Sequence, residues 1–236
     1  QNLVGWARLR VTGAAGTTVT LRFAEVLQPD GTVYTANLRS ARCTDQYILK
    51  GGGGETYEPR FTFHGFRYVE VTSFPGRPGP DAITGIVLHS DTPLHGSFEC
   101  SDPMLNKLYQ NMVWTQRANF FEMPTDCPQR DERLGWAGDA QVFIRTAAFN
   151  MNVAGFFTRW TRDLEDAQYP DGAYPAVAPN PGAWSIGDGG PAWADAGVIC
   201  PWTIYQCYGD TRLLEERYPS MQRFIEFLSR TSREGI

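Results

Sequence analysis

The chain has 236 residues, 42% of them hydrophobic and 13% aromatic, which is enough apolar material for a folded core and too aromatic for a disordered chain. Its net charge of −5 argues against nucleic-acid binding, which usually requires a basic face. No apolar run approaches the roughly 18 residues of a membrane span, and the first residues lack the basic and apolar pattern of a targeting segment. There are nine basic and eight acidic residues up to Leu94, but twelve and eighteen from His95 onward, so carboxylate chemistry is expected in the second half.

The first segment, residues 1–93, is predicted to be an antiparallel β-sandwich of the jelly-roll type. Short alternating runs rich in β-branched and aromatic residues indicate strands. These runs are Thr17–Phe23, Asp45–Leu49, Phe66–Val71 and Ile83–Leu88. The four glycines Gly51–Gly54 lack the Gly-Lys-Ser/Thr of a phosphate-binding loop, so we expect a hairpin loop there.

The second segment, residues 94–236, is predicted to be all-helical. Ser101-Asp102-Pro103 supplies an N-cap and a proline at the first helical position, so a helix should run from there to about Phe121. Further helices are expected at about 139–168, 195–208 and 211–230. In the last, apolar residues spaced by four and three predict a buried stripe of Leu214, Tyr218, Met221, Ile225 and Leu228.

The five cysteines are predicted to be reduced. Cys200 and Cys207 stand seven positions apart on one expected helix, too far for a disulfide at about 1.5 Å per residue. No pair has the Cys-x2-Cys spacing of a zinc site, and the three histidines are too scattered for a metal triad. We expect mostly buried thiols, which favours a cytoplasmic location.

A long connection, Tyr169–Ala194, interrupts the helical segment. Ten of its 26 residues are Gly or Pro, and connections of that length inside a compact domain are usually functional or disordered. Disordered linkers rarely hold four large aromatic residues. We therefore predict an ordered binding loop around Tyr169, Tyr174, Trp184 and Trp193.

The stretch Met123–Asp139 (MPTDCPQRDERLGWAGD) gathers four acidic residues among prolines and glycines that exclude a plain surface helix. Such an array suits glycoside hydrolysis, which needs one protonated carboxyl group for the leaving oxygen and other charges around the sugar. Arginine contacts would favour the ionised form of any acid they touch, so the acid that escapes Arg130 and Arg133 is the better proton donor. The residues alone do not identify it. Trp136 offers a flat face for a sugar ring.

The run DCPQRDERLGWAGD resembles the signature of the bacterial α-L-rhamnosidases, glycoside hydrolase family 78. QNLVGWARLRV and FTFHGFRYVEV are similar to that family's β-sandwich, and GSFECSDPMLNKLYQNMVW is similar to its first barrel helix. The resemblance implies an inverting hydrolase with an (α/α)6 barrel. It implies Glu132 as general acid and Asp126, Arg130, Trp136 and Asp139 as rhamnose contacts.

Inversion also needs a carboxylate that activates water, about 6.5–9.5 Å from the acid. The family's base is a glutamate on a later barrel loop, and no position before Ile236 matches it. We therefore expect a fragment, starting inside a β-domain and ending within the first third of a barrel, that is inactive alone.

Several of these residues have simpler alternatives. Asp139 and Asp195 could each be a helix N-cap, Asp131 could serve only to pair with Arg130 or Arg133, and Trp136 could be a core residue. Trp184 and Trp193 are further candidates for sugar stacking. Trp114 and Trp160 are expected in the core.

The predicted function is the removal of terminal non-reducing α-L-rhamnose from glycosides or polysaccharides, without cofactor or metal. The expected partner is the rhamnosylated substrate, with no nucleic acid or membrane partner and with a homodimer left open. Two alternatives remain at this stage: another (α/α)6 glycosidase or lyase, and a carbohydrate-binding module without catalysis.

Overall fold

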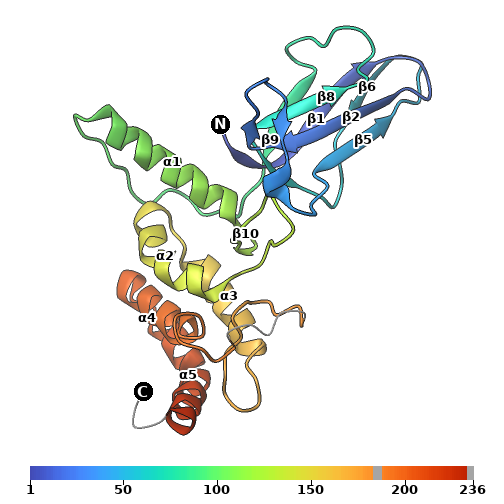
Figure 1. Ribbon diagram of the computed structural model, residues 1–236. Coiled ribbons are helices and arrows are strands. Elements are labelled where there is room, and N and C mark those ends of the chain that lie inside the picture. The colour runs from blue at the N-terminus through green and yellow to red at the C-terminus, as the bar shows by residue number, and fades with distance from the viewer. Residues whose placement is uncertain (183–187, 233–236) are drawn as a thin grey trace. The chain divides into compact units, whose positions relative to one another are not determined.

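The computed structural model describes residues 1–182 and 188–232, and the chain forms two compact units (Figure 1). The first unit contains residues 1–89, 114–121 and 127–133. The second contains residues 90–113, 122–126 and 134–236. The short segment 127–133 is therefore part of the same unit as the β-strands, although helices flank it in sequence.

Two antiparallel sheets form the β-part of the first unit. In one sheet, β1 (Leu3–Thr12) pairs with β6 (Gly54–Tyr57), β7 (His64–Phe66) and β9 (Ile83–Val87). In the other, β2 (Thr18–Ala24) lies between β5 (Thr44–Ile48) and β8 (Tyr68–Thr72). A hairpin joins β3 (Val26–Leu27) to β4 (Val33–Tyr34). The predicted antiparallel β-sandwich is confirmed.

The core of this unit follows the alternation of the central strands. Along β2, Val19, Leu21 and Phe23 are buried, whereas the residues between them are partly exposed. Leu9 and Val11 of β1 belong to the same apolar cluster. Side chains that alternate along two paired sheets in this way form the interior of a sandwich.

Two details of the β-segment differ from the prediction. The run Phe66–Val71 is not one strand, because the chain leaves the β1 sheet at Phe66 and enters the β2 sheet at Tyr68. The glycines at 51–54 do not form a hairpin loop, because β5 and β6 belong to different sheets. They connect the two sheets, and Gly51, Gly52 and Gly53 have positive φ angles.

Five α-helices follow within the part of the chain that the structure describes. They are α1 (Pro103–Asn119), α2 (Ala137–Asn150), α3 (Ala154–Asp166), α4 (Ala196–Tyr208) and α5 (Thr211–Thr231). α1 begins as predicted, because the Asp102 carboxylate accepts a hydrogen bond from Met104 N–H at 2.7 Å and Pro103 is the first helical residue. Two two-residue strands, β10 (Phe120–Phe121) and β11 (Met123–Pro124), follow α1.

The range 139–168 holds two helices. Between them, Asn152 N–H donates to Pro93 O at 2.8 Å, and His95 N–H donates to Asn150 O at 3.0 Å. Met151, fully buried, forms an isolated bridge with Leu94. This extended pairing separates α2, which ends at Asn150, from α3, which begins at Ala154, and it is a long-range effect that local periodicity does not report.

α4 packs against α2, α3 and α5. The buried side of α5 consists of Leu213, Arg217, Ser220 and Phe224. The predicted stripe is wrong, since Tyr218 and Ile225 are 64% and 51% exposed. An ion pair between Arg217 and Glu165, and a hydrogen bond from Gln168 to Ser220 O, favour the more polar face.

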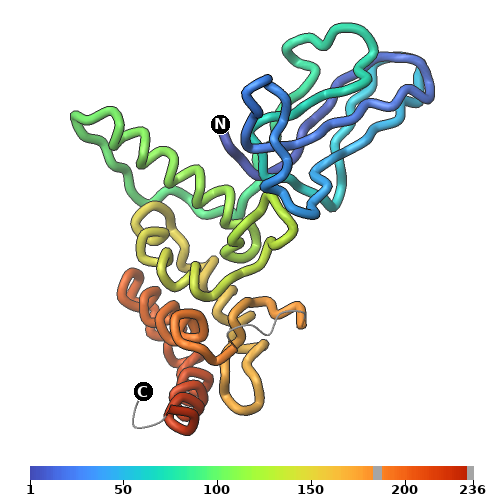
Figure 2. Tube along the Cα trace, in the orientation of Figure 1, coloured from blue at the N-terminus to red at the C-terminus, as the bar shows by residue number. Residues whose placement is uncertain are grey.

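The connection between α3 and α4, orange in Figure 2, is ordered and partly buried over its described residues. Tyr174 is 1% exposed and Val177 is fully buried. Asp188 accepts hydrogen bonds from Tyr169 O–H and Ala176 N–H. The prediction of an ordered loop is confirmed for residues 169–182 and 188–194.

All five cysteines lie within the described ranges, and none of them is in a disulfide. Only Cys43 and Cys200 are buried, so the expectation of mostly buried thiols is wrong. Burial raises the pKa of the Cys200 thiol. Among the described residues, no helix combines the length and the apolar character needed to cross a membrane.

Candidate functional site

Asp126 and Leu134, which stand on either side of segment 127–133, both belong to the helical unit and are hydrogen-bonded to each other. We call the backbone at Asp126 and at residues 134–137 the neck of the motif. Asp126 N–H donates to Leu134 O at 3.0 Å, and Leu134 N–H donates to the Asp126 carboxylate at 2.9 Å. The backbone between them is free of helix, as the prolines and glycines predicted. One oxygen of Asp126 is thus engaged in holding the loop.

The neck is fixed further by the connection between α3 and α4. Ala178 N–H donates to Gly135 O at 3.0 Å, and Ala137 N–H donates to Ala176 O at 2.8 Å. The Trp160 indole N–H donates to Ala178 O at 2.9 Å, and Trp160 is fully buried. The backbone that leads into α2 is therefore determined by a segment about forty residues further along the chain.

Glu132 is held by two arginines. Its Oε2 accepts a hydrogen bond from Arg130 at 2.9 Å and another from Arg39 at 2.8 Å. The Glu132 side chain is 18% exposed. From the sequence, the better proton donor is expected to be an acid without arginine contacts. Glu132 has two such contacts and does not meet that criterion.

Asp131 pairs with a different arginine from those expected. Its two oxygens accept hydrogen bonds from Arg39 Nε, at 2.9 Å, and from the Ser40 hydroxyl. The Ser40 hydroxyl, with the Arg39 charge beside it, holds the pKa of Asp131 below its ordinary value. The proposed pairing of Asp131 with Arg130 or Arg133 is wrong.

Arg133 anchors the segment to the strands. Its guanidinium lies 4.3 Å from the centre of the Phe63 ring and donates to Phe63 O at 2.9 Å. Burial lowers the pKa of Arg133. Nearby, Cys43 Sγ donates to Gln129 O at 3.2 Å. These contacts hold the backbone on both sides of Arg130 and Glu132.

Metal binding at Glu132 is electrostatically disfavoured. Cys127 Sγ and a Glu132 carboxylate oxygen lie within 4.8 Å of each other, a separation that two metal ligands can have. However, Arg39 and Arg130 already contact Glu132, and their positive charges oppose a cation at that carboxylate.

Trp136, Asp139 and Trp193 gather near the start of α2. Trp136 is the N-cap residue and is half-buried, whereas Asp139 is exposed in the first helical turn. Asp139 is therefore not the N-cap. A Cβ added at Gly138 would lie 3.0 Å from Trp193 Nε1, so the Trp193 ring packs against that glycine. Trp193 keeps 41% of its surface exposed, as a stacking residue requires.

The sequence also singles out Asp195, Trp184, Trp160 and Trp114. Asp195 occupies the N-cap position of α4, but its side chain makes no capping hydrogen bond to described residues of that helix. Its carboxylate instead accepts a hydrogen bond from Ala192 N–H, which precedes the helix, at 2.7 Å. Trp184 lies outside the described residues. Trp160 is in the core as predicted, whereas Trp114 is half-buried beside the Arg117 guanidinium, so its expected place in the core is wrong.

The predicted residues thus form two groups, one in each unit. Arg130 and Glu132 contact each other in the first unit. Asp126, Trp136, Asp139 and Trp193 belong to the second. Sequence reasoning missed Arg39, which stands 93 positions before Glu132 with no acidic or aromatic cluster around it to mark it.

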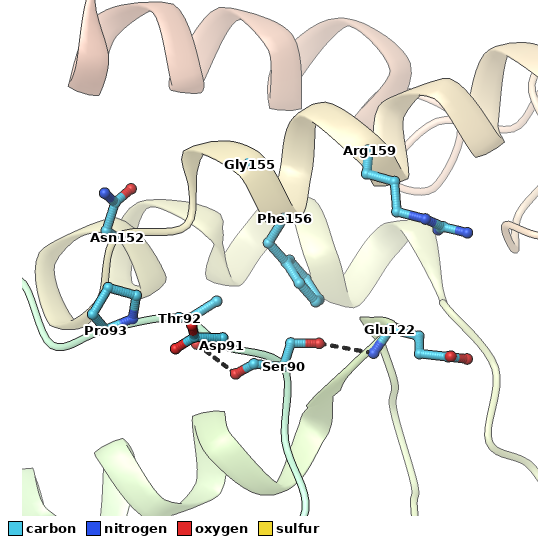
Figure 3. A pocket seen from close by; sticks show the side chains of 9 residues that line it. All are labelled: Ser90, Asp91, Thr92, Pro93, Glu122, Asn152, Gly155, Phe156 and Arg159. Atoms are coloured by element: carbon cyan, nitrogen blue, oxygen red, sulfur yellow. Dashed lines mark hydrogen bonds between the residues drawn. The ribbon is translucent and has the colours of Figure 1, made fainter.

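A pocket of about 500 Å³ opens elsewhere in the helical unit (Figure 3). Its lining includes the charged residues Asp91, Glu122 and Arg159 and the aromatic ring of Phe156. Ser90 Oγ accepts a hydrogen bond from Glu122 N–H at 3.0 Å across one side. None of the described residues that the sequence predicted for the site lines this pocket.

Comparison with known families matches both segments of the chain. Residues 93–236 match the bacterial alpha-L-rhamnosidase 6 hairpin glycosidase domain, and residues 1–89 match the bacterial alpha-L-rhamnosidase concanavalin-like domain. The resemblance found in the sequence is confirmed, as is the order of a β-domain followed by helices of a hairpin barrel.

Relatives that are similar over nearly the whole chain are named alpha-L-rhamnosidase. An alpha-L-rhamnosidase of Streptomyces avermitilis is 58% identical over 98% of this chain, and one of Formosa agariphila is 44% identical over 100%. The crystal structure of the Streptomyces avermitilis alpha-L-rhamnosidase complexed with L-rhamnose matches with a TM-score of 0.96 and 57% identity over 99% of this chain and 22% of its own. This chain spans 22% and 26% of the two curated relatives.

Proposed function

The chain belongs to the bacterial α-L-rhamnosidase family, and on that basis we propose that the protein containing it hydrolyses terminal non-reducing α-L-rhamnosides with inversion of configuration. A similar enzyme is recorded in complex with L-rhamnose, which supports this sugar as the substrate. The motif of clustered acids, arginines and tryptophan supplies the functional groups that the reaction needs.

Glu132 is proposed as the general acid. As the bond between the anomeric carbon and the glycosidic oxygen breaks, the carboxyl group passes its proton to that oxygen. Glu132 Oε2 accepts hydrogen bonds from both arginines, which restricts the direction of the carboxyl group. The partial burial of Glu132 and its fixed direction are the observations that support this role.

The attacking water requires a second carboxylate on the opposite face of the sugar ring. We propose that this general base lies outside the 236 residues, in the remainder of the protein. The proportion of each relative that this chain spans, about a quarter, is consistent with a barrel that further residues complete. By this proposal, the 236-residue chain alone is inactive.

The remaining predicted residues are proposed to hold the sugar. Arg130, Asp126 and Asp139 carry groups that hydrogen-bond hydroxyls. Trp136 and Trp193 offer indole faces for the apolar side of the ring, and Trp193 has the exposure for it. We propose the same role for Trp184.

The test uses the full-length enzyme and the variant Glu132→Gln. Removal of the donated proton should lower kcat on an alkyl α-L-rhamnoside by about 10²- to 10⁴-fold, whereas the control Glu215→Gln, an exposed acid on α5, should match the wild type. Normal turnover of the alkyl rhamnoside by Glu132→Gln would contradict the assignment.

A panel of nitrophenyl glycosides separates this function from its rivals. Selective release from the rhamnoside is expected, whereas release from another sugar would indicate a different glycosidase. Calorimetry with rhamnose, measured beside the activity assay, would identify a binding module if affinity is found without hydrolysis.

A further inference from the structure

Arg39 and Ser40 hold the two consecutive acids of the motif. Arg39 Nε bonds Asp131 at 2.9 Å, and Arg39 Nη2 bonds Glu132 at 2.8 Å. The Ser40 hydroxyl donates to the second oxygen of Asp131. One guanidinium therefore bridges two neighbouring carboxylates from a loop of the β-domain, more than ninety positions earlier in the chain.

The backbone at Arg39 is unusual for a residue other than glycine. Arg39 follows the short 3-10 helix Ala36–Leu38 and has φ 55° and ψ −119°. Leu38, just before it, is 1% exposed and so fixes the end of that helix in the core. Non-glycine residues in such conformations are strained, and they cluster at functional sites where the surrounding structure enforces them.

The contacts of Arg39 with Asp131 and Glu132 affect both the direction and the charge of the Glu132 carboxyl group. The Arg130 and Arg39 guanidiniums meet the same oxygen of Glu132, which restricts the direction of its side chain. Two bare positive charges would favour the ionised form of Glu132 and hinder proton donation. Asp131 offsets one of them, because the Arg39–Asp131 pair carries no net charge.

We propose, on the basis of the proposed function, that Arg39 is a positioning residue for the general acid: held by Asp131, its guanidinium orients the Glu132 carboxyl group toward the glycosidic oxygen. Arg39 acts through Glu132 and does not itself transfer a proton. Orientation of an acid matters most where the leaving group needs its proton, so the effect of Arg39 depends on the leaving group.

The experiment compares wild type, Arg39→Gln and Arg39→Lys in the full-length enzyme on two substrates. An alkyl α-L-rhamnoside needs proton donation, whereas a dinitrophenyl rhamnoside leaves with little help. We expect Arg39→Gln to lower kcat on the alkyl substrate by about 10- to 100-fold with KM nearly unchanged, and to alter kcat on the dinitrophenyl substrate less than about 3-fold.

The Lys variant separates orientation from charge. A lysine restores the positive charge but not the planar bridge to two carboxylates, so Arg39→Lys should remain impaired. Full recovery with lysine would overturn the positioning role. Arg42→Gln, an exposed arginine in the same segment, is the matched control and should behave as wild type.

A double-mutant cycle tests whether Arg39 acts through Glu132. In a Glu132→Gln background, Arg39→Gln should cause no further loss on the alkyl substrate, because the group that it orients can no longer donate a proton. Additive losses, or an Arg39→Gln enzyme with normal alkyl turnover, would overturn this inference alone. Normal turnover by Glu132→Gln would overturn the proposed function and the inference with it.

Asp131→Asn provides a second variant if Arg39→Gln does not fold. It leaves Arg39 in place but weakens the contact that holds the guanidinium and removes the offsetting charge. The same selective loss on the alkyl substrate is expected. Equal losses on both substrates would indicate a structural defect and contradict the proposal.

Discussion

Gly135 lets two backbone segments meet at the neck of the motif. A Cβ at this position would lie 2.2 Å from Ala178 O. That backbone oxygen also accepts a hydrogen bond from the indole N–H of the buried Trp160. Neither segment can move away easily, because Ala178 N–H also donates to Gly135 O. The requirement for glycine here is steric.

Gly135→Ala is therefore expected to destabilise the full-length protein by roughly 1–3 kcal/mol, the usual cost of overpacking. Its matched control is Gly155→Ala in α3, where an added Cβ meets nothing within 4 Å and alanine improves helix propensity by up to about 1 kcal/mol. Denaturant unfolding of both variants checks the prediction. Equal midpoints for the two variants would contradict it.

At the residue scale, the sequence identified the acids of the motif but not what they contact. Glu132, Arg130 and Asp126 could be singled out because they stand close together in the chain. Arg39 and Phe63 could not, because their positions beside the motif depend on how the β-domain folds. Ion pairs between distant positions leave no local pattern.

At the scale of elements, local sequence signals predicted where a helix begins better than where a helix or strand is interrupted. The Asp102-Pro103 cap is encoded in adjacent residues, and α1 begins there. The break at Met151 and the sheet change at Arg67 depend on partners distant in sequence, Pro93 in one case and the two central strands in the other. The glycine-rich link was mistaken for a hairpin loop for the same reason.

Glu55 organises that glycine-rich link. Its carboxylate accepts hydrogen bonds from Tyr47 O–H at 2.7 Å, Gly51 N–H at 3.0 Å and Lys50 N–H at 3.1 Å. The Tyr47 hydroxyl and then the backbone N–H groups lower the pKa of Glu55. Because the folded pKa is lowered, this stabilisation is present above the unfolded pKa of about 4.3 and is lost as pH falls through the folded pKa.

Glu55→Gln should therefore loosen residues 46–57 near neutral pH. Hydrogen exchange of that peptide, corrected for the intrinsic rate, is expected to show greater protection in the wild type at pH 6 and a narrowing difference below about pH 4. Glu70→Gln, which removes a partly exposed ion pair with Arg22, serves as the control and should change little. A difference that is constant with pH would contradict the titration of Glu55.

At the scale of the whole molecule, composition and periodicity predicted the class of each segment. Period-2 runs gave the sandwich, and period-3.6 runs gave the helices. What they did not indicate is that residues 127–133, the centre of the motif, form a compact unit with the strands. Segment 127–133 can pack closely on β7 because a glycine of that strand faces its backbone.

That glycine is Gly65 in β7, where an added Cβ would lie 2.8 Å from the Cβ of Gln129. Gly65→Ala should push the segment bearing Arg130 and Glu132 away from the strands, and a displacement near 1 Å costs about 10²-fold in kcat. The control is Gly85→Ala in β9, also paired with β1, where the added Cβ makes only an ordinary contact at 3.5 Å with Leu3. Rhamnoside hydrolysis by the full-length variants, compared at equal folded fraction, is the measurement. If Gly65→Ala and Gly85→Ala retain the same kcat, the β-domain does not shape the acid-bearing segment in the way that this contact requires.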